Sequence, residues 1–302
     1  MNRFWLASLF AIVVGLMLWL AGCQKQGSSN SSSKPSTPST SSPTTQPGKE
    51  LTLDLGNSVT MKLALIPAGK FTMGSPDSEE YCGIDEVPQR VVTISKPFYM
   101  GVYEVTQEQW TAAMGTTPWK GKEYAKDGAT HAANYISWND ATDFCKKLST
   151  KTGPSTGLRA GKTVSLPTEA QWEYACRAGS KTRFSYGDDD DYSKLGDYAW
   201  FDKNAWNIGE KYPHAVGQKK ANAWGLYDMP GNVWEWCADW WGSYANAGKA
   251  DPSGPASGSY RMLRGGSFLD YAGFCRSSDR TNTGPADGSY DHGFRVVVPP
   301  GL

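Results

Sequence analysis

The thiols and imidazoles of this 302-residue chain do not form the usual metal or redox motifs. No two of its six cysteines have Cys-x-x-Cys spacing, and its three histidines, His131, His214 and His292, are far apart. Zinc sites and thioredoxin-like redox sites depend on closely spaced ligands of these types. The sequence therefore supports neither kind of chemistry.

The cysteine count predicts at least one unpaired thiol. If Cys23 is modified, as argued below, five cysteines remain, an odd number. Cys145 falls on the apolar side of a helical pattern over 139–149, beside Ala141, Phe144 and Leu148, which predicts a buried free thiol. The pattern does not decide the pairing among Cys82, Cys176, Cys237 and Cys275.

The segment 268–292 has a composition suited to recognition. It contains no Lys, Glu, Gln, Met or Trp. Those types fill 49 of the 217 positions in residues 51–267, so about six would be expected in a segment of this length. Tyr, Ser, Gly, Asp, Asn, Thr and Phe predominate instead, and antibody paratopes use a similar set. The alternative interpretation is an ordinary polar loop.

The N-terminus predicts export. A positive charge at Arg3 precedes an apolar run from Phe4 to Leu20, so residues 1–22 are interpreted as a signal peptide. Leu20-Ala21-Gly22-Cys23 resembles the bacterial lipobox, which implies lipidation of Cys23. Gln24, which is not Asp, favours the outer membrane or cell surface of a bacterium. The alternative is a plain transmembrane anchor.

Residues 23–50 are rich in Ser, Thr and Pro, which predicts a disordered tether. We expect a single folded domain over 51–302 because no repeat or clear break divides it. From Leu51 onward, 26 Lys and Arg residues face 29 Asp and Glu residues. This balance gives no indication of a nucleic-acid partner.

Local patterns predict short strands, a few helices and many loops. The predicted strands are Met61–Ile66, Val91–Ile94, Phe98–Tyr103 and Val164–Leu166. Helices are expected over Thr106–Met114, from Ser137, and over Glu169–Ala178, where Thr168 to Gln171 has capping-box spacing. The Trp residues are interpreted as core and loop anchors.

Six motifs then occur in one order. They are Ile66-Pro67-Ala68-Gly69-x-Phe71-x-Met73-Gly74-Ser75, Tyr103-Glu104-Val105-Thr106, Leu166-Pro167-Thr168-Glu169-Ala170-Gln171-Trp172-Glu173-Tyr174-Ala175, Gly225-Leu226-Tyr227-Asp228-Met229-x-Gly231-Asn232-Val233-Trp234-Glu235-Trp236, Arg264-Gly265-Gly266-Ser267 and Gly293-Phe294-Arg295. The set resembles the formylglycine-generating enzyme (sulfatase-modifying factor) family. That resemblance implies a complex, loop-rich α+β variant of the C-type lectin fold, but it does not fix the activity.

The resemblance argues against copper. The family's enzymes oxidise a sulfatase cysteine with copper held by two thiolates, and soft Cu(I) needs that sulfur pair. Counted from Gly265-Gly266-Ser267, the first thiolate position is Asp270 and the second is Cys275. Copper is therefore not expected. Cys275 is left either paired with Cys237 or as a packed thiol.

The resemblance also implies calcium. The family binds it through positions that match Asp228, the carbonyls of Gly231 and Val233, and Glu235. Such hard oxygen ligands suit this ion. The alternative is that the two carboxylates only cap turns.

Two functions compete. The first is a surface-displayed ligand-binding lipoprotein, resembling the variable proteins that retroelements diversify. Adenine-directed mutagenesis of an Asn codon ending in a pyrimidine cannot produce Lys, Glu, Gln, Met or Trp, the types absent from 268–292. The second is a formylglycine-generating oxidoreductase with an altered site, in which Cys275 would be the catalytic thiol. Asp270 favours the first, and so does a composition suited to changeable contacts.

We therefore expect a variable binding face for an unknown protein or glycan ligand, with no catalytic residue. Ala272, Cys275, Arg276 and Arg280 are interpreted as framework. The expected ligand contacts are Leu269, Asp270, Tyr271, Gly273, Phe274, Asp279, Asn282, Ser289, Tyr290 and Asp291.

Overall fold

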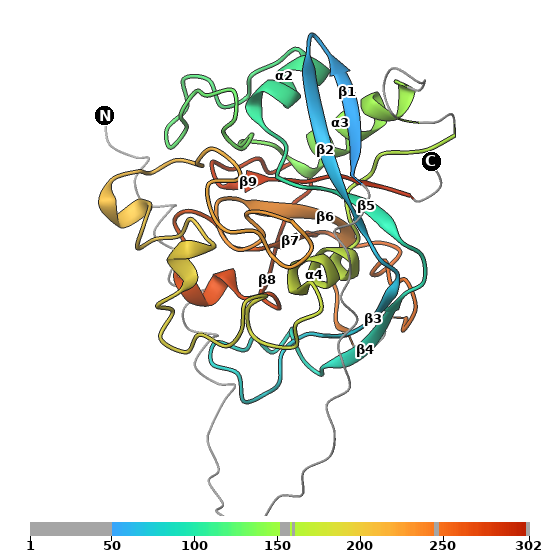
Figure 1. Cartoon of the computed structure of the whole chain (residues 1–302), viewed down its shortest axis with the longest axis vertical. Helices are drawn as coiled ribbons and strands as arrows, with labels where there is room; N and C mark the ends of the chain where they lie inside the picture. The colour runs from blue at the N-terminus through green and yellow to red at the C-terminus, as the bar shows by residue number, and fades with distance from the viewer. Residues whose placement is uncertain (1–49, 152–157, 159–160, 245–247, 300–302) are drawn as a thin grey trace, which may run out of the picture.

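The computed structural model describes residues 50–151, 158, 161–244 and 248–299 (Figure 1). The expected signal peptide, Cys23 and almost all of the tether lie outside these residues. Among the described helices, none has the length and apolar character needed to cross a membrane.

Three small sheets are connected by long irregular segments. The first joins both ends of the domain, in the order β1 (Leu51–Gly56), β2 (Val59–Ile66), β5 (Phe98–Gly101), β10 (Val297–Val298). The second is the antiparallel pair β3 (Gly69–Met73) and β4 (Arg90–Ile94). The third has the order β8 (Arg280–Thr283), β7 (Arg261–Arg264), β6 (Trp234–Trp240), β9 (His292–Gly293).

The three α-helices of the described residues begin at hydrogen-bonded capping boxes. They are α2 (Gln107–Met114), α3 (Trp138–Thr150) and α4 (Glu169–Arg177), with N-caps Thr106, Ser137 and Thr168. In each, the N-cap hydroxyl accepts from the N3 amide and the N3 side chain accepts from the N-cap amide, which satisfies two otherwise free donors. The 3₁₀ turns are η3 (Leu195–Asp197), η4 (Trp206–Ile208) and η6 (Ala272–Cys275).

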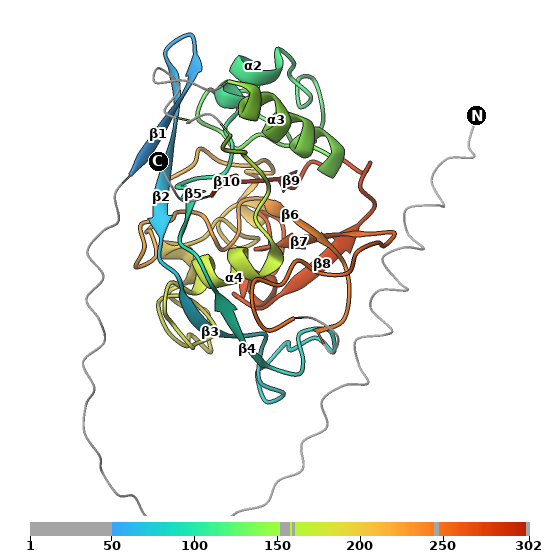
Figure 2. The same cartoon turned by 90° about the vertical axis from the view of Figure 1, so that its right-hand side faces the viewer.

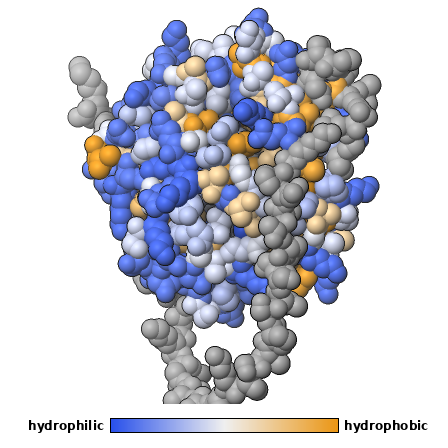
Figure 3. Space-filling model, in the orientation of Figure 1, coloured by the Kyte–Doolittle hydropathy of each residue, from blue (hydrophilic) through white to orange (hydrophobic). Residues whose placement is uncertain are grey.

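The helices occupy different layers. Figure 2 shows α2 and α3 together at the end of the molecule that carries the β1–β2 hairpin, whereas α4 lies centrally. Helix α4 contacts β3, β4, β6 and β7, so it bridges the second and third sheets. On the face shown in Figure 3, hydrophilic residues dominate and hydrophobic residues appear in small groups between them.

The structure confirms the three helices and the strands predicted around Met61–Ile66, Val91–Ile94 and Phe98–Tyr103, with small changes at their ends. The strand predicted over Val164–Leu166 is wrong. Only Ser165 makes an isolated bridge, to Val297. The apolar side chains of Val164 and Leu166 are buried in the core, so their pattern reflects burial in an irregular segment.

Cys145 is a buried free thiol, as predicted, and burial raises the pKa of its thiol. Cys176, Cys237 and Cys275 are likewise buried and free, so Cys275 is a packed thiol and is not bonded to Cys237.

Fully buried arginines hold the loops of the third sheet. Arg264, Arg276 and Arg295 are each 0% exposed. The guanidinium of Arg295 binds both carboxylate oxygens of Glu235, with N–O distances of 2.6 and 2.7 Å. Arg264, from the Arg-Gly-Gly-Ser motif, pairs with carboxylates of α4. The Arg-Gly-Gly-Ser and Gly-Phe-Arg motifs therefore connect β7 and the segment between β9 and β10 to the core.

Replacing Arg295 with Met should lower the free energy of unfolding by about 3–5 kcal/mol, because Glu235 would stay buried without its countercharge. Chemical denaturation measures this. The exposed pair Lys146–Asp143 gives the matched control, since Lys146→Met should change stability by less than about 1 kcal/mol. Equal small effects at both sites would contradict the role of the buried pair.

Candidate binding face and buried acid cluster

The segment 268–292 is attached to the third sheet along its length. It leaves β7, passes through η6, pairs with β7 again as β8, and ends at β9 beside β6. The stretches 268–279, which contains η6, and 284–291 connect these elements.

The four residues interpreted as framework are buried. Arg276 forms ion pairs with Glu79 at 2.8 Å and Glu86 at 2.7 Å. Arg280 donates to both oxygens of Glu169, at 2.7 and 2.9 Å. Burial of Ala272 and Cys275 completes the frame. Two side chains within the segment thus connect it to acids far away in sequence.

The predicted contact residues divide by exposure. Tyr271 is 72% exposed. Seven others are partly exposed: Leu269, Asp270, Phe274, Asn282, Ser289, Tyr290 and Asp291. Their contact with a ligand stays a prediction.

Two predicted contacts need correction. The side chain of Asp279 is buried, because it pairs with Arg276 at 3.1 Å, so it does not present an accessible carboxylate. Gly273 is buried against the ring of Tyr81, and a Cβ there would lie 3.0 Å from that ring. Neither residue faces solvent in this structure.

Sequence reasoning missed an aromatic cluster, which we define as Tyr124, Tyr135, Trp206 and Tyr290. The ring of Tyr290 lies 5.1 Å from Tyr124 and 6.5 Å from Tyr135, between centroids. Trp206 lies 5.1 Å from Tyr124. Three of the four rings come from outside the segment, so the cluster combines one ring of 268–292 with three rings from other parts of the domain. No spacing rule in the sequence connects them.

Asp270 lies in a mostly enclosed environment. It accepts a hydrogen bond from the Ser267 hydroxyl. Its pKa is raised to about 7, mainly by burial and to a smaller extent by the nearby carboxylate of Asp291. Burial, and then Asp270, also raise the pKa of the Cys275 thiol. A protonated thiol next to a carboxyl group lacks the two-thiolate character that soft copper needs.

Of the two carboxylates predicted to bind calcium, one has both oxygens hydrogen-bonded and the other has one oxygen without a hydrogen-bond partner. Both oxygens of Glu235 are bound by Arg295, and the Trp172 indole also donates to one of them at 2.8 Å. Asp228 accepts from the Gly217 amide at 2.6 Å, while its Oδ1 is buried without a partner. Among the described residues, no group of three or more His, Cys, Asp or Glu side chains is arranged to hold a metal.

Glu104 is the carboxylate that the sequence analysis overlooked here. It is buried, one oxygen accepts from Asn232 at 2.9 Å, and its Oε2 has no partner. Burial, and then Asp228, raise its pKa well above the usual range, and burial raises that of Asp228 to about 6. The signal was its place in Tyr103-Glu104-Val105-Thr106, one of the six motifs.

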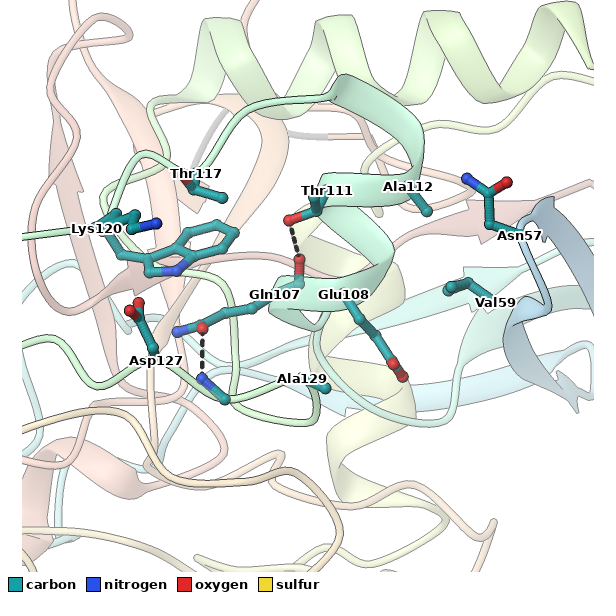
Figure 4. A pocket seen from close by; sticks show the side chains of 12 residues that line it. Asn57, Val59, Gln107, Glu108, Thr111, Ala112, Thr117, Lys120, Asp127 and Ala129 are labelled. Atoms are coloured by element: carbon teal, nitrogen blue, oxygen red, sulfur yellow. Dashed lines mark hydrogen bonds between the residues drawn. The ribbon is translucent and has the colours of Figure 1, made fainter.

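A separate pocket of about 400 Å³ lies beside α2 and the β1–β2 turn (Figure 4). Gln107 lies on its wall, where its side chain accepts from the Gly128 amide at 2.9 Å. The pocket contains no thiol or histidine, and no residue of 268–292 lines it. It is not part of the binding face.

With this geometry in place, the comparisons identify the family. A family model described as the sulfatase-modifying factor enzyme 1-like domain matches residues 56–299. The chain belongs to this family. Formylglycine-generating enzyme from Mus musculus is 29% identical over an alignment of 299 positions that covers 78% of this chain and 75% of the mouse protein.

Two solved structures of similar fold add to this assignment to the sulfatase-modifying-factor family. Variable protein 1 of Treponema denticola has a TM-score of 0.70 and 30% identity, covering 83% of this chain and 99% of its own. PvdO from Pseudomonas aeruginosa has a TM-score of 0.72 and 29% identity, covering 85% and 100%. Both confirm the predicted α+β, C-type-lectin-like fold, and variable protein 1 confirms the likeness to variable proteins.

Asp270→Asn should reduce the pH dependence of stability. Since folding raises the pKa of this carboxyl from 3.8 to about 7, its contribution to the stability of the protein is most favourable at low pH and falls as pH rises through that window. From about pH 4 to about pH 8, the wild type should lose at least ~1 kcal/mol more than the variant. Parallel curves from denaturation at several pH values would contradict the raised pKa.

Proposed function

We propose that this protein is a lipid-anchored ligand-binding protein, displayed on the outer membrane or cell surface of a bacterium, whose variable segment 268–292 forms its binding site. The observation that carries the proposal is the division within this segment. Arg276 and Arg280 are buried in ion pairs, whereas Tyr271 between β7 and β8 is 72% exposed. A fixed frame with exposed, changeable side chains is what a diversified binder needs.

The chain is similar both to a variable protein and to formylglycine-generating enzymes, so the proposal rests on its own residues. Asp270 replaces one thiolate of the family's copper site and Cys275 is buried. These features disfavour the alternative, a formylglycine-generating oxidoreductase acting on a sulfatase cysteine. Likeness to variable protein 1 of Treponema denticola favours binding. The expected ligand is a protein or glycan at a cell surface, with Tyr271 and Tyr290 as aromatic anchors.

Tyr271→Asn should leave stability within about 0.5 kcal/mol of the wild type, because the side chain is exposed. Tyr260→Asn is the matched control, since Tyr260 is 52% exposed and lies outside the segment. On arrays of immobilised glycans and surface proteins, Tyr271→Asn should lose about 2 kcal/mol of any specific binding, and the control should lose none. Stoichiometric copper and oxidation of a sulfatase-motif peptide by the wild type would overturn the choice.

For the anchor, we expect acyl chains on Cys23 and membrane partitioning, which Cys23→Ser should abolish. Mass spectrometry of the N-terminal peptide reads the modification directly. An unmodified Cys23, or retention of Met1–Leu20 as an uncleaved segment, would reject the lipoprotein assignment.

We also propose calcium as a structural ion. The unpartnered oxygens of Asp228 and Glu104 fit it, because buried anionic oxygens without donors require a cation or a proton. These two residues, with the Gly231 and Val233 carbonyls implied by the family, would hold the ion. Glu235 would contribute chiefly by holding Arg295, since its oxygens are already engaged.

Calcium should raise the melting temperature of the wild-type domain by mass action. Asp228→Asn should abolish that increase, and Glu104→Gln should reduce or abolish it. The exposed Glu108→Gln is the matched control and should retain it. Identical melting curves for the wild type with calcium and with chelator would reject the site.

A further inference from the structure

A second cavity, of about 420 Å³, lies where β4, the first turn of α4 and the end of β6 meet residues 248–255. No residue of 268–292 lines it, so it is separate from the binding face. Its volume is within the range of small-molecule sites, roughly 300–1,000 Å³. Arg90, Asp239 and the indole of Trp240 are among the groups on its walls.

Arg90 has no carboxylate partner among the residues that the structure describes. Its Nη1 donates weakly to the carbonyls of Tyr244 and Gly248, at 3.4 and 3.3 Å, and its Nη2 contacts the sulfur of Met73 at 3.7 Å. Its Nε is buried without an acceptor. The undescribed residues contain no Asp or Glu side chain that could supply one.

This differs from the other arginines of the region. Arg264 and Arg280 both pair with Glu169, so that carboxylate is already neutralised. Asp251, also on the cavity wall, accepts from the amide and hydroxyl of Ser95. Arg90 therefore has no ion pair on the cavity wall, where its guanidinium carbon lies 5.0 Å from the centre of the Tyr244 ring. At this partly buried position charge pairs are screened less than on the surface.

Asp239 is a further carboxyl group on the cavity wall. It is buried, and its Oδ2 accepts from the Glu169 amide at 2.9 Å. Burial, and then the charge of Glu169, raise its pKa to about 7. Near neutral pH this carboxyl group thus exists partly as a hydrogen-bond donor.

We propose that this cavity binds a small carboxylate-bearing molecule, whose carboxylate pairs with Arg90 and lies next to Asp239, with Trp240 contacting its apolar part. Ionised Asp239 would repel the ligand, whereas protonated Asp239 can donate to it. Binding should therefore tighten as pH falls through about 7. The charged or titratable groups around Asp239 and on the cavity wall are Arg90, Glu169, Cys237, Tyr244, Asp251, Arg261 and Arg280.

The test uses acetate as the probe and methylammonium as the opposite charge. Both are titrated into the folded ¹⁵N-labelled protein, following the Trp240 indole signal, assigned with Trp240→Phe, and the α4 amides of Glu169 and Ala170. Acetate should shift these signals saturably in the millimolar range, more strongly at about pH 6 than at about pH 8. Methylammonium should not.

Arg90→Gln should abolish the acetate response, while Arg90→Lys should retain part of it, and unchanged signals elsewhere report that both fold. Asp239→Asn should bind acetate equally at both pH values. Lys146→Gln, an exposed cation elsewhere, should behave like the wild type. An equal acetate response in Arg90→Gln, a response to methylammonium alone, or no response to either probe would overturn the proposal.

Discussion

The fold depends on arginines of its C-terminal third that reach buried carboxylates from other parts of the chain. Arg276 binds Glu79 and Glu86, and Arg280 binds Glu169, across more than 100 positions of sequence in each case. Most of the described residues lie outside helices and strands, so backbone ladders connect only part of the domain. The ion pairs fix the position of loops that would otherwise have few restraints.

These buried ion pairs mainly determine which arrangement of the loops forms. Removing buried charges from water costs about as much as their attraction returns, so their net stabilisation is modest. An unpaired buried guanidinium is far more costly, however, and this penalty excludes arrangements in which Arg276 leaves Glu86. On the proposed function, the 268–292 segment would change its exposed side chains without changing its path, provided that the two arginines remain.

The features that the sequence predicts correctly depend mostly on residues that are close together in sequence. The capping boxes at Thr106, Ser137 and Thr168 are encoded within four residues, and all three helices begin there. The framework role of Arg276 and Arg280 was also predictable. The fold was predictable from six motifs that occur in one order and resemble a known family. The periodicity of apolar residues alone would not have predicted it.

The features that the sequence does not predict depend on contacts between residues that are far apart in sequence. Asp279 resembles any polar loop residue until Arg276 is placed beside it. Tyr124, Tyr135 and Trp206 join Tyr290 only through tertiary structure. Glu104 shows its importance through an oxygen that lacks a partner, which is a property of burial and not of spacing. Val164–Leu166 has a strand-like pattern but lies in an irregular part of the core.

Hydrogen exchange of Arg276→Met tests most directly whether this pairing holds the segment in place. Amides of 268–292 should exchange faster than in the wild type, while β2, α2 and α3 keep their protection, and Tyr271→Asn should show no change in either region. Unchanged exchange of 268–292 in Arg276→Met, or faster exchange spread evenly over the whole domain, would contradict the account.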